Sequence, residues 1–404
     1  MKKIWDKWTR IALVKRILVG LILGAILGIA VPQATGIAIL GDVFVSALKA
    51  IAPLLVFFLV ISSLCNAGKS HGGVIKTVII LYMFSTVLAA VIAVFASMAF
   101  PVKMTLANAA TDTSAPQGIV EVLNNLLLNV VANPVSSLVN ANYVGILMWA
   151  VLLGLAFRAA DKMTKKVLAD VADGISMVVT WIINLAPFGI FGLVFNTVST
   201  NGLDIFTTYG KLLLLLVGCM LFIYFVTNPL LVYWCIRQNP YPLIFHCLKR
   251  SALTAFFTRS SAANIPVNMK VCEEMGLDRD TYSVTIPLGA TINMDGAAIT
   301  ITVMTMATAF TLGIHVDIPT AIILSLLAAL SACGASGVAG GSLLLIPMAC
   351  SLFGISDDIS MQVVAVGFII GVVQDSVETA LNSSSDLLLS ASAEFRQWRL
   401  EGEE

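Results

Sequence analysis

Charged residues are scarce in this sequence, since Asp, Glu, Lys and Arg make up only 11% of it, against roughly 25% in soluble domains. Hydrophobic residues make up 58%, and the mean hydropathy is +0.96. The 23 acidic and 23 basic residues balance, which argues against nucleic acid as a partner. This composition excludes an ordinary soluble domain and indicates a polytopic membrane protein.

Motifs of enzymes and metal centres are also missing. The seven cysteines lie singly and form no CxxC pair, so disulfide and zinc sites are not expected. No Gly-x-Ser-x-Gly or His-Glu-x-x-His occurs. Gly68-Lys69-Ser70 imitates the end of a phosphate-binding loop, but position 63 is serine where that loop requires glycine. We therefore do not expect an enzyme.

Long apolar stretches, by contrast, are abundant. A helix needs about 20 predominantly apolar residues to cross the hydrocarbon core of a bilayer. We expect a transmembrane helix in each apolar stretch of about that length, with the basic N-terminal segment retained ahead of the first. The eight stretches are residues 14–31, 42–66, 75–100, 140–158, 176–199, 206–236, 282–312 and 359–392.

Two further apolar segments, residues 243–270 and 318–355, are interrupted by polar or glycine-rich runs at 258–266 and 331–342. Lys and Arg flank the first segment on both sides, whereas Asp and His flank the second. Because Lys and Arg accumulate in cytoplasmic loops, we predict one hairpin that re-enters from the inside and one from the outside. Both chain termini are then cytoplasmic.

Each interrupted segment precedes a long helix with polar residues at mid-membrane, which indicates the inverted repeats of secondary transporters. Non-helical backbone is tolerated at membrane depth only where it is buried in protein or lines a cavity. We therefore expect both hairpin tips to face one central site. Helix N-termini can bind an anion there, and opened carbonyls can bind cations.

The last helix carries a polar stripe that marks this site. Asp375, Thr379, Asn382 and Asp386 are spaced four, three and four apart and share one helical face, with Glu378 at its margin. Carboxylates at this depth mark an ion or substrate path by default. The competing interpretation is that they are structural and are satisfied by serines and backbone.

The preceding long helix carries a second polar cluster. Thr291, Asn293, Met294 and Asp295 are nearly consecutive and cannot share one helical face, so we expect locally opened backbone there. Carboxylate, amide and carbonyl oxygens suit a hard cation such as sodium. In the third span, Tyr82, Ser85 and Thr86 lie at i, i+3 and i+4 and could complete an ion cage. The alternative is that Ser85 and Thr86 only bond back to their own helix.

Four motifs, at residues 258–266, 293–296, 336–342 and 375–386, resemble in order and spacing the signature regions of the dicarboxylate/amino acid:cation symporter family. The resemblance covers essentially the whole chain. It implies the all-α glutamate-transporter fold, with eight transmembrane helices and two oppositely oriented re-entrant hairpins. It also implies a homotrimer in the bacterial inner membrane, in contact with lipid, that works by an elevator mechanism.

The same resemblance divides the chain into a scaffold and a moving transport domain. Scaffold helices 1–2 would occupy residues 1–74, and scaffold helices 4–5 residues 101–204. Helix 3 (75–100) would belong to the transport domain. The transport-domain core would occupy residues 205–404, with helix 6, a hairpin at 243–270, helix 7 at 279–313, a hairpin at 318–355 and helix 8 at 357–394.

For the substrate, the resemblance implies that Asp375 binds the ammonium group, together with the carbonyls of Arg259 and Val338. Asn382 and the amide of Ser261 would bind the carboxylate. The substrate-binding set is Arg259, Ser260, Ser261, Ala297, Val338, Ser342, Asp375, Glu378, Thr379 and Asn382.

For coupling, the resemblance implies two or three sodium ions per protomer, each held by side-chain and backbone oxygens. The implied sets are Asp386 with Gly289, Asn293 and Asn382; Asp295 with Asn293, Ser85, Thr86 and the Tyr82 carbonyl; and Thr291 and Met294 with the second hairpin at Ala332, Cys333 and Ala335.

Three departures from the family's acidic-substrate members concern specificity. Those members have arginine, threonine and glycine where this chain has Glu378, Ala297 and Ser342. A carboxylate in place of arginine removes a bidentate partner and repels a second carboxylate. We therefore expect sodium-coupled import of a small neutral amino acid with a hydroxyl, L-serine or L-threonine, whose hydroxyl Ser342 and Thr379 could contact.

Several alternatives stay open at this point. Glu378 could carry a proton, or it could form a fixed salt bridge to Arg259 with no part in selectivity. A sodium- or proton-coupled symporter of acidic amino acids or dicarboxylates, or a neutral amino acid exchanger, would share the fold. An anion-conducting channel is the more distant possibility.

Overall fold

The computed structural model describes residues 11, 13–66, 73–106, 128, 131–203, 205–335 and 340–402. Within these residues every regular element is helical, as the sequence predicted. In this part of the chain six helical stretches are long and apolar enough to cross a membrane, and shorter apolar helices accompany them. The six are Thr35–Ser62, Gly73–Ala99, Lys162–Asn184, Phe206–Ile236, Arg279–Thr311 and Asp357–Glu401.

The first part of the chain, up to Asn201, forms helices that pack mainly on one another. The close pairs are α2 with α9, and α3 with α7, α8 and α9. Their bounds are α2 (Leu13–Ala30), α3 (Ala38–Asn66), α4 (Gly73–Ala99), α6 (Pro134–Val139), α7 (Tyr143–Ala156), α8 (Lys162–Asn184) and α9 (Ala186–Asn201).

The exception is α4, which packs instead on helices from the second half of the chain. Its neighbours include α16, α17, α19, α15 and α10. The helices of this half are α10 (Ile205–Phe222), α11 (Asn228–Ile236), α12 (Tyr241–Cys247), α13 (Leu253–Thr258), α14 (Ser261–Glu274), α15 (Arg279–Ile292), α16 (Asp295–Thr311), α17 (Ile318–Ala332), α18 (Ile346–Ser351) and α19 (Asp357–Glu401).

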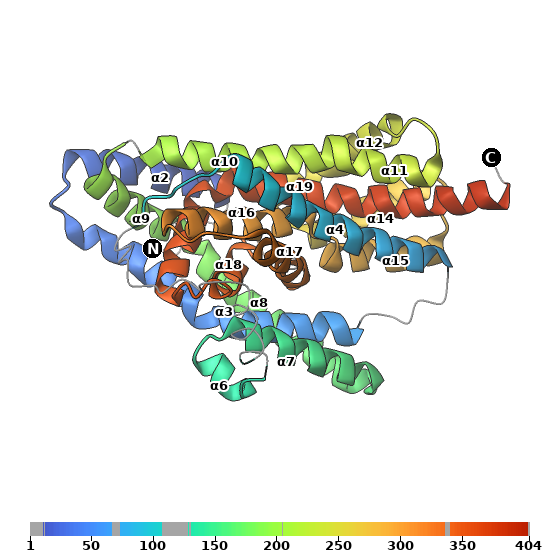
Figure 1. Ribbon diagram of the computed structural model, residues 1–404, viewed down its shortest axis with the longest axis horizontal. Helices are drawn as coiled ribbons and strands as arrows, with labels where there is room; N and C mark the ends of the chain where they lie inside the picture. Colours follow the sequence, from blue (N-terminus) through green and yellow to red (C-terminus); the bar gives the residue numbers. More distant parts are fainter. Residues whose placement is uncertain are drawn as a thin grey trace.

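The longest helix, α19, organises this second group. Figure 1 shows it running lengthwise through the molecule beside α10 and α11. Between Ile359 and Glu394 nearly all of its side chains are buried, the polar ones included. It packs on α13, α14, α15, α16 and α18. The polar stripe of α19 is therefore enclosed by the interrupted segments and by the preceding long helix.

The predicted span at residues 176–199 is divided in the structure. Pro187 lies in the first turn of α9, where its missing N–H and its ring prevent α8 from continuing. The helix α8 also begins earlier than expected, at Lys162, in the stretch between the predicted spans 140–158 and 176–199. Asp161 caps it by accepting a hydrogen bond from the Thr164 amide at 2.7 Å, and this bond lowers the pKa of the Asp161 carboxyl. The apolar stretch used to predict this span starts too late, because the first turns of α8 carry charges.

The close approach of α2 and α9 depends on glycine. A Cβ added to Gly24 would lie 2.6 Å from the carbonyl oxygen of Phe191, so no larger residue fits there without moving a helix. Such small-residue contacts are typical of helix pairs in membranes.

Both interrupted segments are broken where the sequence predicts. In the first, α13 ends at Thr258 and α14 begins at Ser261, with Arg259 in the left-handed region (φ 52°) between them. Ser260 caps α14 by accepting a hydrogen bond from the Ala263 amide at 3.2 Å. In the second, α17 ends at Ala332 and the chain returns through α18; residues 336–339 lie outside the described residues.

Candidate functional site

The long helix at residues 279–311 is opened at the polar cluster, as predicted. The helix α15 ends at Ile292 and α16 begins at Asp295. Between them Asn293 (φ −98°, ψ 81°) and Met294 (φ −120°, ψ 50°) leave the helical region. The freed Gly296 amide donates to Oδ1 of Asn382 on α19 at 2.7 Å. The break therefore presents backbone groups to the polar stripe.

Asp295 forms one cluster of buried oxygens with α4. The Ser85 hydroxyl donates to its Oδ2 at 2.7 Å and the Thr86 hydroxyl to its Oδ1 at 3.1 Å. All three residues are fully buried. The alternative that these hydroxyls only bond back to their own helix is thus wrong. Asn228 is also fully buried, with its Oδ1 3.5 Å from the Ser85 hydroxyl oxygen; the sequence reasoning missed it because nothing placed it near the motif.

Asp386 forms a second cluster with the opened segment. Nδ2 of Asn293 donates to its Oδ1 at 2.9 Å and to the Ser385 hydroxyl at 2.8 Å. Among the described residues, the buried Oδ1 of Asn293 has no hydrogen-bond partner. A buried acceptor without a donor is costly, and a cation coordinated there would satisfy it. These oxygens fit a hard cation such as sodium.

Tyr82 connects α4 to this second cluster. Its hydroxyl donates to the backbone carbonyl of Asp386 at 2.8 Å and lies 2.7 Å from the hydroxyl of Ser390. The sequence resemblance assigned only the carbonyl of Tyr82 to a cation. The structure gives its side chain a further position, between α19 and α15, because the hydroxyl also lies 3.3 Å from the carbonyl oxygen of Thr285.

Gly289 lies so close to Asp386 that no side chain fits. An added Cβ would lie 2.7 Å from Oδ1 of Asp386 and 2.9 Å from the Tyr82 hydroxyl. We expect Gly289→Ala to displace the carboxylate and to weaken sodium activation of transport about tenfold, in line with an overpacking cost of about 1–3 kcal/mol. The measurement is uptake as a function of sodium concentration.

Gly210→Ala is the matched control for this substitution, because a Cβ at Gly210 meets nothing within 4 Å. It should leave the sodium dependence unchanged. An unchanged sodium dependence in Gly289→Ala as well would show that Asp386 has no part in cation binding.

Some of the residues implied for a third cation lie near one another in the structure. Sγ of Cys333, at the end of α17, lies 3.8 Å from the carbonyl of Ile292, so the second interrupted segment reaches the break. The Thr291 hydroxyl donates to its own helix at the Leu288 carbonyl, and its oxygen lone pairs and its backbone carbonyl stay available to a cation. The Met294 sulfur accepts from Nδ2 of Asn382 at 3.5 Å. Ala332 and Ala335 belong to the same end of α17.

Asp375 is paired with Arg259, the residue at the tip of the first interrupted segment. Nε of Arg259 lies 2.6 Å from Oδ2 of Asp375, and both side chains are largely buried. The Gly340 amide donates to the other oxygen, Oδ1, at 3.3 Å. The alternative of a fixed Arg259 to Glu378 salt bridge is therefore wrong, and the guanidinium has a contact that the sequence reasoning did not foresee.

Glu378 lies in a pocket of neutral donors. Its Oε2 accepts hydrogen bonds from the hydroxyls of Thr300 at 2.7 Å and Ser342 at 2.9 Å, and from the amide of Gln374. Gln374 also donates to Thr300 at 2.8 Å. Thr300 and Gln374 were missed by the sequence reasoning, although Gln374 stands one helical turn before Glu378 and could have signalled the contact.

The other predicted substrate-binding residues within the described part of the chain lie on α14, α16 and α19 or cap α14. Ser261, Ala297 and Thr379 are buried, and Ser260 forms the cap of α14. Val338 lies outside the described residues. Asp295, Asp375, Glu378 and Asp386 are all buried, and among the described residues Arg259 pairs with Asp375.

Broken helices that meet at buried carboxylates within a multi-pass bundle define a membrane transporter. The profile of the sodium:dicarboxylate symporter family matches residues 13–394, and the chain belongs to this family.

Two relatives resemble the chain over nearly its full length. A serine/threonine transporter, SstT, of Bifidobacterium adolescentis is 58% identical over 398 residues, which are 98% of this chain and 93% of that protein. A protein of the same name from Streptococcus thermophilus is 55% identical over 400 residues, which are 99% of this chain and 100% of the relative.

Proposed function

We propose that this chain is a sodium-coupled symporter that imports L-serine and L-threonine. The observation that carries the proposal is the environment of Glu378, a buried carboxylate held by hydroxyl and amide donors beside Asp375. A second acidic side chain would meet a like charge there, which is strongly unfavourable in a buried site. A small neutral side chain with a hydroxyl has no such penalty. The serine/threonine transporters named above support the same choice.

The substrate ammonium would bind Asp375, and this requires that Arg259 gives up one oxygen of that carboxylate. The substrate carboxylate would bind Asn382 and the first amides of α14, at a helix N-terminus that favours anions. The freed guanidinium of Arg259 would lie beside that same carboxylate. A zwitterion can therefore enter the Arg259–Asp375 pair without leaving either charge unpaired.

The substrate hydroxyl would lie near Glu378, Ser342 and Thr379. Glu378 accepts three hydrogen bonds on Oε2, so its other oxygen, Oε1, is the acceptor that the hydroxyl would reach. Thr300 and Gln374 would act as positioning residues, because they hold the carboxylate in place from α16 and α19.

Sodium would bind at the two carboxylate clusters and at the break in the long helix. Asp295 with Ser85 and Thr86 forms one set of oxygens, and Asp386 with Asn293 forms another. Four carboxylates against one guanidinium favour the entry of cations. Two or three ions per protomer fit these sets, and a third would lie between Thr291 and the end of α17.

The architecture we propose has eight membrane spans and two re-entrant hairpins, with both termini on the cytoplasmic side of the bacterial inner membrane. The segregation of contacts supports a scaffold of α2, α3 and α7–α9 and a transport domain of α4 and α10–α19. Elevator movement of this domain within a homotrimer is part of the proposal.

The test of this function is uptake of radiolabelled L-serine into proteoliposomes under an inward sodium gradient. We expect uptake that needs sodium and is blocked by unlabelled threonine but not by aspartate. Potassium and proton gradients are the controls. Uptake of aspartate, or uptake driven by protons alone, would overturn the specificity or the coupling, and flux that follows voltage without saturation would indicate a channel.

Removing the charge of Asp295 should affect sodium more than serine. We expect Asp295→Asn to raise the sodium concentration for half-maximal uptake more than tenfold, since a carboxylate is replaced by a neutral ligand. Serine affinity at saturating sodium should change less than threefold. The measurement is sodium-dependent uptake at fixed serine, and Asp280→Asn, an exposed acidic residue in the first turn of α15, is the control.

A further inference from the structure

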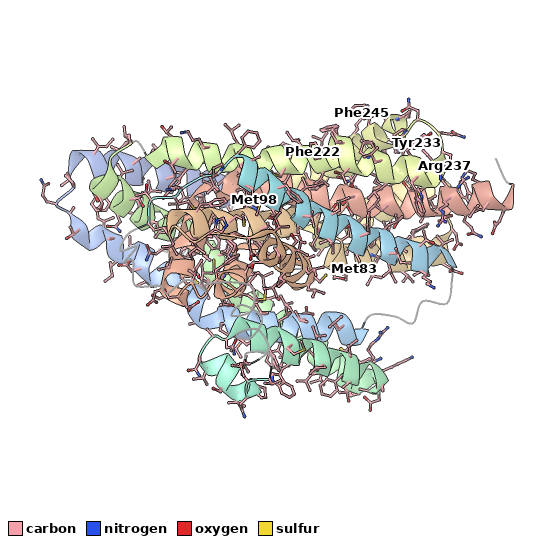
Figure 2. All side chains as sticks on the ribbon, in the orientation of Figure 1. Met83, Met98, Phe222, Tyr233, Arg237 and Phe245 are labelled. Carbon is pink, nitrogen blue, oxygen red and sulfur yellow. The ribbon has the colours of Figure 1, made fainter. Side chains whose placement is uncertain are left out.

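A long apolar groove lies on the outside of the molecule between α4 and α10, away from the carboxylates. Its volume is about 830 Å³. In Figure 2, Met98 lies on α4 and Phe222 on α10, the two helices that border it. The lining residues are Ile92, Phe95, Ala96, Ala99, Phe100, Pro101, Val102, Lys211, Leu214, Leu215, Gly218, Cys219 and Phe222.

The groove is built by one face of each helix. On α10 its residues recur at i, i+3, i+4, i+7, i+8 and i+11, from Lys211 to Phe222. These eleven steps span about 16 Å along the helix axis. The lining combines small residues such as Ala96 and Gly218 with large exposed side chains such as Phe95 and Leu214. The shape is that of a slot for a narrow apolar chain.

The two helices that border the groove are apolar enough to span the membrane, so the groove opens toward lipid and not toward water. Phe95, Leu214 and Phe222 are 55%, 75% and 47% exposed. At membrane depth such exposed apolar side chains contact acyl chains.

The charge at one end of the groove indicates which kind of lipid headgroup would fit there. Lys211 is exposed and is the one charged residue among the described lining residues, none of which is acidic. Lys103, also exposed, follows Val102 directly in the sequence. Basic side chains at the membrane interface attract anionic lipid headgroups and reach them with their long stems. The positive end and the apolar slot are thus arranged as in a site for an anionic amphiphile.

We propose that this groove binds an anionic phospholipid, with one acyl chain along Gly218 and Cys219 and the phosphate at Lys211. The bound chain bridges α4 and α10. Because α4 carries Ser85 and Thr86, which hold Asp295, the lipid stabilises the helix that forms part of the cation site. The site is independent of which amino acid is transported.

Gly218 offers a way to fill the groove without disturbing the fold. A Cβ at Gly218 meets nothing within 4 Å, and the same holds for Gly210 on the same helix, which is not part of the groove lining. Gly218→Leu would therefore occupy the slot, and Gly210→Leu is its matched control. Lys211→Gln removes the charge and leaves the slot open.

The experiment is native mass spectrometry of the delipidated full-length protein. It is titrated with phosphatidylglycerol or with phosphatidylcholine of the same acyl chains, and thermal unfolding is recorded in parallel. We expect the wild type and Gly210→Leu to bind phosphatidylglycerol about fivefold more tightly than phosphatidylcholine. Lys211→Gln should lose this preference, and Gly218→Leu should lose the binding of both lipids and the thermal stabilisation.

Equal binding of both lipids by the wild type, or an unchanged preference in Lys211→Gln, would overturn the anionic headgroup. Binding by Gly218→Leu equal to that by Gly210→Leu would overturn the groove as the site. If Gly218→Leu instead changed the oligomeric state, the groove would be a contact between copies of the chain and the lipid proposal would be wrong.

Discussion

Asp375→Asn is expected to reduce sodium-driven serine uptake by about a hundredfold or more, since breaking a buried ion pair costs about 3–5 kcal/mol. The carboxylate is the only one of the four that pairs with a cation within the described residues, and it is the proposed ligand of the substrate ammonium. The measurement is uptake by proteoliposomes with equal amounts of reconstituted protein.

A loss of uptake in this variant could also come from the buried Arg259 that is left without its partner. The double variant Asp375→Asn with Arg259→Gln removes both charges and should recover the thermal stability of the wild type. If its stability recovers while its uptake stays as low as that of the single variant, the loss comes from the substrate site that Asp375 and Arg259 form and not from an unpaired buried charge. If uptake returns with stability, Asp375 is structural and the proposed ammonium site is wrong.

Glu378→Arg should shift the specificity of the site from serine toward aspartate. We expect serine uptake to fall by about a hundredfold. In the wild type the hydroxyls of Thr300 and Ser342 donate to the Glu378 carboxylate; in the variant they would face a guanidinium, and the negative charge beside them would be gone. Aspartate should become an effective competitor, since arginine can pair with its side-chain carboxylate. Gln374 has a buried oxygen with no hydrogen-bond partner among the described residues, which could accept from the new arginine.

The control for this substitution is Glu378→Gln, which keeps the size of the side chain and an oxygen acceptor. It should retain serine uptake within about tenfold, as expected when a charge-assisted hydrogen bond becomes a neutral one. Competition by unlabelled serine and aspartate measures both effects. Unchanged serine affinity in Glu378→Arg would mean that Glu378 only supports the structure.

Much of this site could be predicted from the sequence because its signals are local. The spacing of Asp375, Thr379, Asn382 and Asp386 places them on one face of any helix. The consecutive polar residues at 293–295 predicted the break between α15 and α16, which the structure confirms. Composition alone excluded a soluble enzyme.

The partners of these residues could not be predicted, because they come from elements that the sequence does not place in space. Arg259 pairs with Asp375 across more than a hundred residues of chain, and Thr300 reaches Glu378 from another helix. Asn228 lies at a π-helical turn, Ile223–Thr227, which has no simple sequence signature. The beginning of α8 at Lys162 was not predicted. Apolar runs alone were counted, and the charged first turns of this amphipathic helix are not part of such a run.

Simultaneous flux of radioactive sodium and tritiated L-serine into the same proteoliposomes tests the central claim most directly. Serine should raise sodium entry in a fixed ratio, sodium entry without serine should be low, and both fluxes should disappear in Asp375→Asn. Serine entry that is unaffected by the removal of sodium, or sodium entry that does not respond to serine, would contradict sodium-coupled symport.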